Sequence, residues 1–255
     1  MSIDETARRA WDPAGAASYD RGRPGYAPGA LGWLVRKGVL GPGRCVVDVG
    51  AGTGKLTRQL MLARARVVAV EPLPAMRARL PPRLAVGGVA EALPVASGWA
   101  ELVTVAQAFH WFRPAEAAAE IARVLQPRGW LALLWNDEAK EADWPDLDHR
   151  LKELLAFHGI VTPPGRAKGA WQAEFDASGL FSPWEERQFK HSVESTLDTL
   201  VDQLGSYSRL AAQPLELRER ILREAAALIA AHPVMGGRRQ VLVPYRTTLM
   251  TCTRR

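Results

Sequence analysis

The sequence predicts an α/β protein: a seven-stranded, mostly parallel sheet with helices on both faces and a helical cap inserted after the fifth strand. Three observations support this fold class. Short apolar runs alternate with helical periodicity between residues 45 and 135, the first run leads into a glycine-rich turn, and amphipathic helices dominate after residue 136. Alternating strands and helices form parallel strands joined by right-handed crossovers, so helices are expected on both faces of the sheet.

Each predicted strand is a short apolar run bounded by Gly, Pro or charged residues. The strands are expected at residues 45–49, 66–70, 84–86, 102–106, 130–135, 189–193 and 240–253. The predicted helices carry apolar residues at helical spacing, and several begin or end at Pro or Gly. They are expected at residues 31–40, from 56 onward, and at 76–80, 114–125, 147–157 and 215–231.

The chain of 255 residues is expected to form one domain, residues 1–255. Within it we expect an N-terminal lid at 1–30, a cofactor-binding core at 31–136, a helical substrate cap at 137–237 and a last strand at 238–255. Residues 1–30 contain too many Gly and Pro residues for one long helix and too many aromatic residues for a disordered tail.

Composition narrows the possible partners. The net charge is +6 and the pI is near 9.7, but the basic residues are scattered and form no long runs, so nucleic acid is not expected as a partner. The two cysteines form no C-x-x-C pair, and no metal site is expected. The first residues are polar and no apolar run is long enough to span a bilayer, so we expect a cytoplasmic protein without a membrane partner. A monomer or weak dimer is expected.

The glycine-rich turn at residues 50–54 favours a nucleotide-like ligand, because glycines there let the backbone approach a ligand closely. A Walker A loop would need Gly at Val49 and Ser or Thr at Leu56, so this interpretation fails at two positions. A dinucleotide fingerprint would need its third Gly at Lys55, which weakens that interpretation without excluding it. A tight turn without a ligand is a third alternative.

The segment Asp-x-Gly-x-Gly-x-Gly at 48–54 resembles motif I of the class I S-adenosylmethionine-dependent methyltransferases, which have a Rossmann-like fold. Glu71 follows the second strand, where this family places an acidic residue, and residues 125–129 resemble the family's turn before strand five. The segments 23–26, 90–94 and 106–112 resemble the methyltransferases of type 11, including ubiquinone/menaquinone-type and trans-aconitate-type enzymes.

The resemblance implies S-adenosyl-L-methionine as cofactor and S-adenosyl-L-homocysteine as its product. The implied cofactor-binding residues are Tyr19, Arg23, Asp48, Gly50, Ala51, Gly52, Thr53, Gly54, Glu71, Pro72, Met76, Ala90, Glu91 and Gln107. Val89 departs from the relatives, which often have Asp at that position, so backbone groups near Ala90 and the Glu91 side chain are expected to meet adenine.

The substrate residues are expected near the end of the fourth strand, in the N-terminal lid and in the cap. The candidates are Tyr26, His110, Trp111, Trp135, Trp171, Tyr207 and Arg209. His110 is the candidate catalytic base, because an imidazole can accept a proton from a hydroxyl or amine near neutral pH. A hydrogen-bonded packing role is its alternative.

Together these features predict a small-molecule methyltransferase that transfers a methyl group by in-line displacement to O, N or C, with a carboxylate or hydroxyl favoured. The alternatives are a nicotinamide-dependent oxidoreductase and an adenosyl-cofactor-binding protein without catalytic activity. The acceptor atom cannot be deduced from the residues.

Overall fold

The computed structural model describes residues 10–138, 144–160 and 170–255. The chain divides into two compact units. Unit 1 comprises Met1–Pro24, Glu138–Pro164 and His191–Tyr245, and unit 2 comprises Gly25–Asp137, Gly165–Lys190 and Arg246–Arg255. Residues 1–9 of the expected lid (1–30), and residues 139–143 and 161–169 of the expected cap (137–237), lie outside the described residues.

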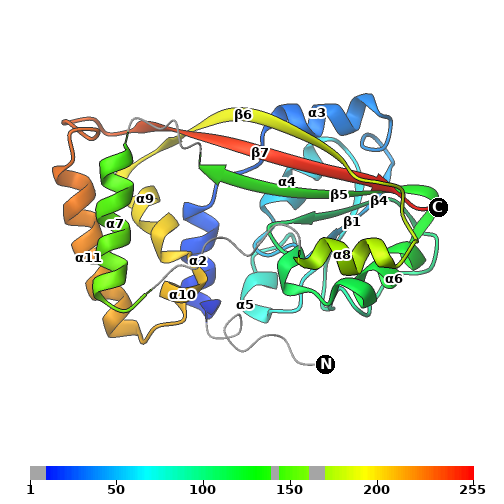
Figure 1. Ribbon diagram of the computed structural model, residues 1–255, viewed down its shortest axis with the longest axis horizontal. Helices are drawn as coiled ribbons and strands as arrows, with labels where there is room; N and C mark the ends of the chain where they lie inside the picture. The colour runs from blue at the N-terminus through cyan, green and yellow to red at the C-terminus, as the bar shows by residue number, and fades with distance from the viewer. Residues whose placement is uncertain (1–9, 139–143, 161–169) are drawn as a thin grey trace. The chain divides into compact units, whose positions relative to one another are not determined.

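Seven strands form one sheet in the order β3-β2-β1-β4-β5-β7-β6, which confirms the predicted fold class (Figure 1). The strands are β1 (Cys45–Val49), β2 (Arg66–Val70), β3 (Ala85–Val86), β4 (Ala100–Ala106), β5 (Leu125–Glu138), β6 (Glu185–Ser195) and β7 (Val241–Thr253). The first five strands pair in parallel, whereas Figure 1 shows β7 running opposite to β5. We call the edge where β1, β2, β4 and β5 begin the amino edge, and the edge where they end the carboxyl edge.

The helices of unit 2 connect these strands. They are α3 (Pro28–Arg36), α4 (Lys55–Leu62), α5 (Pro74–Arg77), the 3-10 helix η1 (Phe109–Trp111), α6 (Pro114–Val124) and α8 (Ala170–Ala177). Alternate residues of each central strand face opposite sides of the sheet. Leu131 and Leu133 of β5 therefore pack with residues of α6 and α8, while Ala132 and Leu134 pack with residues of α3 and α4.

Unit 1 is mainly helical. Its helices are α2 (Pro13–Gly22), α7 (Pro145–Phe157), α9 (Leu197–Gly205), α10 (Ser208–Ala211) and α11 (Leu215–Ala231). Helix α11 packs against α7 and α9, and α2 packs against α9. Two histidine–carboxylate pairs join α7 to α11: His158 with Glu224 and His232 with Asp146, each at 2.9 Å.

The helices and strands differ from the sequence expectation in two informative places. Helix α2 forms although its segment is rich in Gly, because the Asp12 side chain accepts a hydrogen bond from Gly15 N at 2.7 Å and Pro13 occupies the first helical position. Strand β5 begins at Leu125, not at residue 130, and its register against β4 shifts in this region. The expected stop at residues 127–129 is thus an irregularity inside the strand.

The region after β5 contains α7, α8 and α9 to α11, with β6 between α8 and α9. Helix α8 belongs to unit 2 and the other four belong to unit 1. The role of this region as a substrate cap remains a prediction. Among the described helices, none combines the length and apolar composition needed to span a bilayer.

Candidate active site

The candidate site lies at the carboxyl edge of the sheet in unit 2. The glycine loop (residues 50–54) follows β1, Glu71 follows β2 and Gln107 follows β4. Backbone hydrogen bonds fix these junctions: Gly50 N donates to Val70 O at 2.9 Å, and Gln107 N donates to Leu134 O at 2.9 Å. Ligands of parallel α/β sheets bind beyond the carboxyl ends of the strands. The fold therefore brings these predicted cofactor residues to the edge where a ligand is expected.

The loop has a conformation that requires glycine. Gly50, Gly52 and Gly54 have φ of 66°, 58° and 90°, in the left-handed region that side chains with a Cβ disfavour. A Cβ on Gly50 would lie 2.7 Å from Ala108 Cβ, so packing also excludes a side chain there. A Cβ on Gly52 would meet no atom within 4 Å. The loop thus has open space above Gly52.

Glu71 connects the loop to the end of β2. Its side chain is buried, Oε2 accepts a hydrogen bond from Gly52 N at 2.8 Å, and Oε1 accepts one from Leu73 N at 2.9 Å. Burial raises the pKa of Glu71 to about 7, against the two backbone hydrogen bonds that lower it. Each carboxylate oxygen keeps acceptor capacity for a ligand hydroxyl.

Asp48 lies beneath the loop and is fully buried. Its two carboxylate oxygens accept hydrogen bonds from Thr57 Oγ1 at 2.6 Å and Thr104 Oγ1 at 2.9 Å. Burial raises the pKa of Asp48 to about 6, and the two hydroxyl bonds lower it only in part. Asp48 therefore connects β1, β4 and α4, and its contacts fit an organising role in the loop.

We expect Asp48→Asn to stabilise the free protein at about pH 8. The raised pKa means that the folded state holds the proton of Asp48 more tightly than the unfolded chain, so stability declines as pH rises from about 4 to about 6. The ionised form then costs roughly 3 kcal/mol. An amide removes this cost and can still accept from one threonine hydroxyl and donate to the other. Urea unfolding at several pH values measures the gain; a variant less stable than the parent at pH 8 contradicts the account.

The remaining predicted cofactor residues surround the loop. Thr53 is buried, and its hydroxyl has no hydrogen-bond partner in the described part of the chain. Met76 and Ala90 are buried, as is Leu93, three residues after Ala90. Glu91 Oε1 accepts a hydrogen bond from Arg113 N at 2.8 Å. Two further predicted residues flank these groups: Ala51, whose N donates to Val70 O, and Pro72, whose carbonyl accepts from Arg77.

Gln107 has a strained backbone, with φ of 55° for a residue that has a Cβ. Its Nε2 donates to Asn136 O at 2.8 Å, and Asn136 Nδ2 donates to Gly25 O at 2.8 Å. Gln59 completes this arrangement, because its amide group both donates to and accepts from the backbone of Tyr26. The ends of β4 and β5 are thereby tied to the segment that precedes α3.

Sequence reasoning missed Gln59 and Asn136. Asn136 directly follows the predicted fifth strand, so its place at the carboxyl edge was a usable signal. Gln59 lies within a predicted helix, and nothing in the sequence pattern marks it. Both residues act on backbone groups distant in sequence, which the sequence does not pair.

The predicted substrate residues of unit 2 occupy different surroundings. His110 lies in η1 with its ring centroid 5.1 Å from that of Trp111. Trp135, at the end of β5, stacks on Trp171 of α8 with centroids 5.9 Å apart and an angle of 24° between the rings. Tyr26 is buried in the core beneath α3. The half-buried rings of Trp135 and Trp171 thus lie above the core on the α6 and α8 side.

The other predicted residues belong to unit 1. Arg23 Nε donates to Ser206 Oγ at 2.7 Å, and its guanidinium lies 5.6 Å from the ring centroid of Tyr19 and 5.1 Å from that of Tyr207. Its two terminal nitrogens make no hydrogen bond to the described residues. Arg209 is exposed on α10. The roles of these four predicted residues, at 19, 23, 207 and 209, in binding cofactor or substrate remain predictions.

The strand order, the glycine loop and the acidic residue after β2 define the Rossmann-like fold of the class I methyltransferases. The family described as "Methyltransferase domain" matches residues 47–133, which cover the loop, Glu71 and most of β5. An uncharacterized methyltransferase of Mycobacterium tuberculosis is 36% identical over 244 residues, 92% of each chain. A methyltransferase-like protein of Schizosaccharomyces pombe is 28% identical over 236 residues, 91% of this chain and 90% of its own. The chain belongs to this methyltransferase family.

Solved structures share the fold. A putative type II methyltransferase from Anaeromyxobacter dehalogenans has a TM-score of 0.60 and 24% identity, covering 91% of this chain and 97% of its own. The phosphoethanolamine N-methyltransferase 2 of Haemonchus contortus, in complex with S-adenosyl-L-methionine, has a TM-score of 0.55 and 14% identity, covering 100% of this chain and 60% of its own. At these identities the likeness concerns the fold alone.

Proposed function

We propose that this chain is an S-adenosyl-L-methionine-dependent methyltransferase that acts on a small molecule. The methyl group passes by in-line displacement to an O, N or C acceptor, and a carboxylate or hydroxyl is favoured. The single observation that carries the cofactor assignment is the hydrogen bond between Glu71 and Gly52 N. It holds a carboxylate with free acceptor capacity beside the open space over the glycine loop.

The loop and its neighbours fit the cofactor. Glu71 would accept hydrogen bonds from the ribose hydroxyls, and the unpartnered hydroxyl of Thr53 offers a further polar group. Met76, Ala90 and Leu93 supply buried apolar surface for adenine, while Gly52 leaves room for the methionine and ribose portion. When bound, the cofactor supplies a methyl group already activated by the sulfonium, so the protein's task is alignment.

Charge at the site favours this cofactor over a dinucleotide. Asp48 and Glu71 are both buried near the loop. A buried carboxylate is stabilised by a nearby cation and destabilised by a pyrophosphate. A sulfonium and an ammonium group are attracted by two carboxylates, whereas the two negative charges of a pyrophosphate are repelled. Asp48 alone distinguishes the two cofactors by charge, because dinucleotide-binding folds also place an acidic residue after the second strand to bind the ribose.

Unit 1 contains a group suited to a carboxylate. The Arg23 guanidinium is held by Ser206 and by two tyrosine rings, while its terminal nitrogens have no acceptor among the described residues. Two parallel N–H donors of this kind match the geometry of a carboxylate. This supports the predicted role of Arg23 in binding a ligand carboxylate, such as the methionine carboxylate of the cofactor.

The proposal is tested by mass spectrometry of products formed from S-adenosyl-L-methionine and a panel of carboxylates, phenols and amines. The expected result is one acceptor that gains a single methylene unit, together with S-adenosyl-L-homocysteine. The non-catalytic alternative would be favoured if the cofactor bound tightly and its methyl group were accessible, but no acceptor of any class were methylated.

We expect His110→Ala to lower turnover roughly 100-fold and to leave cofactor affinity unchanged, because a positioned base contributes about that factor. His149→Ala is the matched control, since His149 is exposed on α7. Steady-state rates and a cofactor titration are measured on both variants. Unchanged turnover, or loss of cofactor binding, would exclude His110 as the base.

A further inference from the structure

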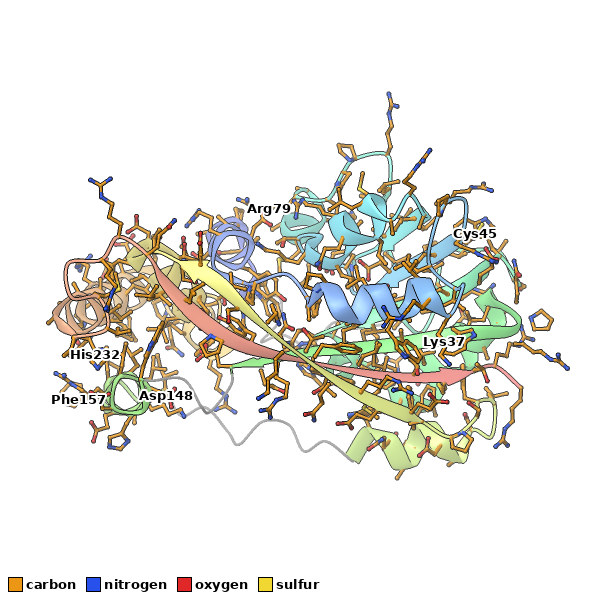
Figure 2. All side chains as sticks on the ribbon, turned by 90° about the horizontal axis from the view of Figure 1, so that it is seen from above. Lys37, Cys45, Arg79, Asp148, Phe157 and His232 are labelled. Carbon is orange, nitrogen blue, oxygen red and sulfur yellow. The ribbon has the colours of Figure 1, made fainter. Side chains whose placement is uncertain are left out.

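The amino edge of the sheet in unit 2 gathers basic residues that are far apart in the sequence. Arg66 pairs in register with Cys45, Arg66 N donates to Arg44 O at 2.8 Å, and Gly43 N donates to Arg64 O at 3.0 Å. Figure 2 shows Cys45 and Lys37 at the same end of the sheet. The segments that meet at this edge carry the basic residues of what we call the amino-edge patch: Arg36, Lys37, Arg44, Arg64, Arg66, Arg128, Arg254 and Arg255.

Few acidic groups compensate these charges. Glu101 pairs with Arg44, whereas the side chains of Arg36, Arg64, Arg66, Arg128 and Arg255 make no hydrogen bond or ion pair to another described residue. Glu185 and Glu186, at the start of β6, bound the patch beyond β7. Unit 2 as a whole carries 20 Lys and Arg against 11 Asp and Glu, while unit 1 carries 13 against 16. The positive charge of the chain is thus concentrated in unit 2.

The same edge exposes apolar side chains. Helices α3 and α4 both end there, and their last residues include Val35 (47% exposed), Met61 (42%) and Leu62 (84%). Leu180, 37% exposed, lies beside the last residue of the chain, since Arg255 N donates to Leu180 O at 2.9 Å. These four are the large, exposed apolar side chains of the described part of unit 2. Val35, Met61 and Leu62 lie on the face covered by α3 and α4, and Leu180 lies against α6 on the other face, so apolar side chains accompany the arginines on both sides of this edge.

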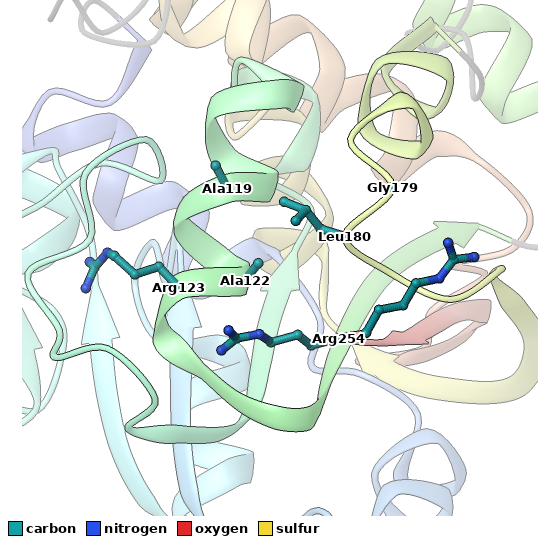
Figure 3. A pocket seen from close by; sticks show the side chains of 7 residues that line it. Ala119, Ala122, Arg123, Gly179, Leu180 and Arg254 are labelled. Atoms are coloured by element: carbon teal, nitrogen blue, oxygen red, sulfur yellow. The ribbon is translucent and has the colours of Figure 1, made fainter.

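A shallow cavity of about 380 Å³ opens at this edge. Figure 3 shows Leu180 facing Ala119 and Ala122 of α6, with Arg254 at the rim. Arg123 also lines it, but its guanidinium is occupied by Glu120 and by the carbonyl groups of residues 93 and 95. The cavity therefore combines an apolar wall with a basic rim.

We propose that the amino-edge patch docks on an anionic lipid bilayer. Basic side chains are attracted to acidic headgroups, and apolar side chains such as Leu62 enter the interface between headgroups and acyl chains. A second copy of the chain is disfavoured because it would place like charges together. Nucleic acid would use the arginines but would give the exposed leucines and methionine no role.

This surface is invisible in the linear sequence, where its arginines are separated by up to 219 positions. The expectation of no nucleic-acid partner was based on that scatter, and the expectation of no membrane partner on the lack of a long apolar run. The glycine loop lies at the opposite edge of the sheet, so docking leaves the candidate active site uncovered by lipid. The inference is independent of the proposed function.

The test is sedimentation of the full chain with lipid vesicles. We expect binding to phosphatidylcholine vesicles that contain about one third phosphatidylserine, weak binding to phosphatidylcholine alone, and release by high salt. The triple variant R64Q/R66Q/R128Q is expected to bind about 100-fold more weakly, because it loses the attraction of three arginines to the acidic headgroups. A tenfold loss of affinity corresponds to roughly 1.4 kcal/mol. The control R150Q/R220Q/R239Q removes three exposed arginines of unit 1 and should bind as the parent does.

The variant Leu62→Ser distinguishes docking on lipid from binding to other polyanions, since only lipid buries an apolar side chain. It should weaken vesicle binding roughly tenfold and leave the cofactor affinity unchanged. Equal binding to neutral and anionic vesicles, or equal losses in the two triple variants, would overturn the proposal. A Leu62→Ser variant with parental vesicle affinity would also overturn the proposal. If the parent bound a DNA duplex more tightly than the anionic vesicles, the patch would be assigned to nucleic acid.

Discussion

Gly52→Ala is expected to weaken S-adenosyl-L-methionine binding roughly 100-fold, because a Cβ at this position enters the space assigned to the ligand and overpacking costs about 3 kcal/mol. In the free protein that Cβ meets no atom within 4 Å. The loss of folding stability should therefore be limited to the left-handed backbone at φ 58°, about 1 kcal/mol.

Gly43→Ala provides the matched control. Gly43 has φ of 75°, its added Cβ also meets no atom within 4 Å, and it lies at the amino edge of the sheet. Both variants should lose similar stability in urea, but only Gly52→Ala should lose affinity in a cofactor titration. Equal affinities for the two variants would show that no ligand passes over Gly52.

Cofactor affinity should also depend on pH through Glu71. The carboxylate has a pKa of about 7 in the free protein, and the ribose hydroxyls require its ionised form. Below about pH 7 the ligand must displace a proton, so affinity should rise by up to tenfold per pH unit and level off above about pH 7.5. Titration calorimetry in buffers of different ionisation enthalpy measures the released proton.

Glu71→Gln should bind weakly and lose the parental rise in affinity between about pH 6.5 and 7.5, because the amide does not titrate; a slope closer to pH 6 belongs to Asp48. Glu116→Gln, a change on the exposed face of α6, should keep the parental profile. A parental slope in the Glu71→Gln variant would mean that another group controls the affinity.

Much of the fold could be predicted because local patterns determine it. The apolar runs of β1 and β2 and the periodicity of α11, predicted at 215–231 and found at Leu215–Ala231, reflect burial that the sequence records directly. Helix α2 was not predicted, because the Gly and Pro residues of segment 1–30 argue against a helix, whereas its stabilising cap at Asp12 is a single local contact. The start of β5 was placed too late, since a strand irregularity resembles a turn.

The candidate site, like the fold, could be predicted from the sequence only in part. The glycine loop and Glu71 were found from spacing, and parallel topology carries both to the carboxyl edge. The contacts of Asn136 with Gly25 and the burial of Asp48 depend on packing between distant segments, which no local pattern encodes. The amino-edge patch illustrates this most clearly, because arginines scattered along the chain become neighbours only in the sheet.

Titration calorimetry of the full chain with S-adenosyl-L-homocysteine and with NAD tests the central claim most directly. The account predicts saturable binding of S-adenosyl-L-homocysteine at one site, weakened roughly 100-fold in Gly52→Ala and unchanged in Gly43→Ala, with no binding of NAD. Binding of NAD without binding of the adenosyl ligand would contradict it.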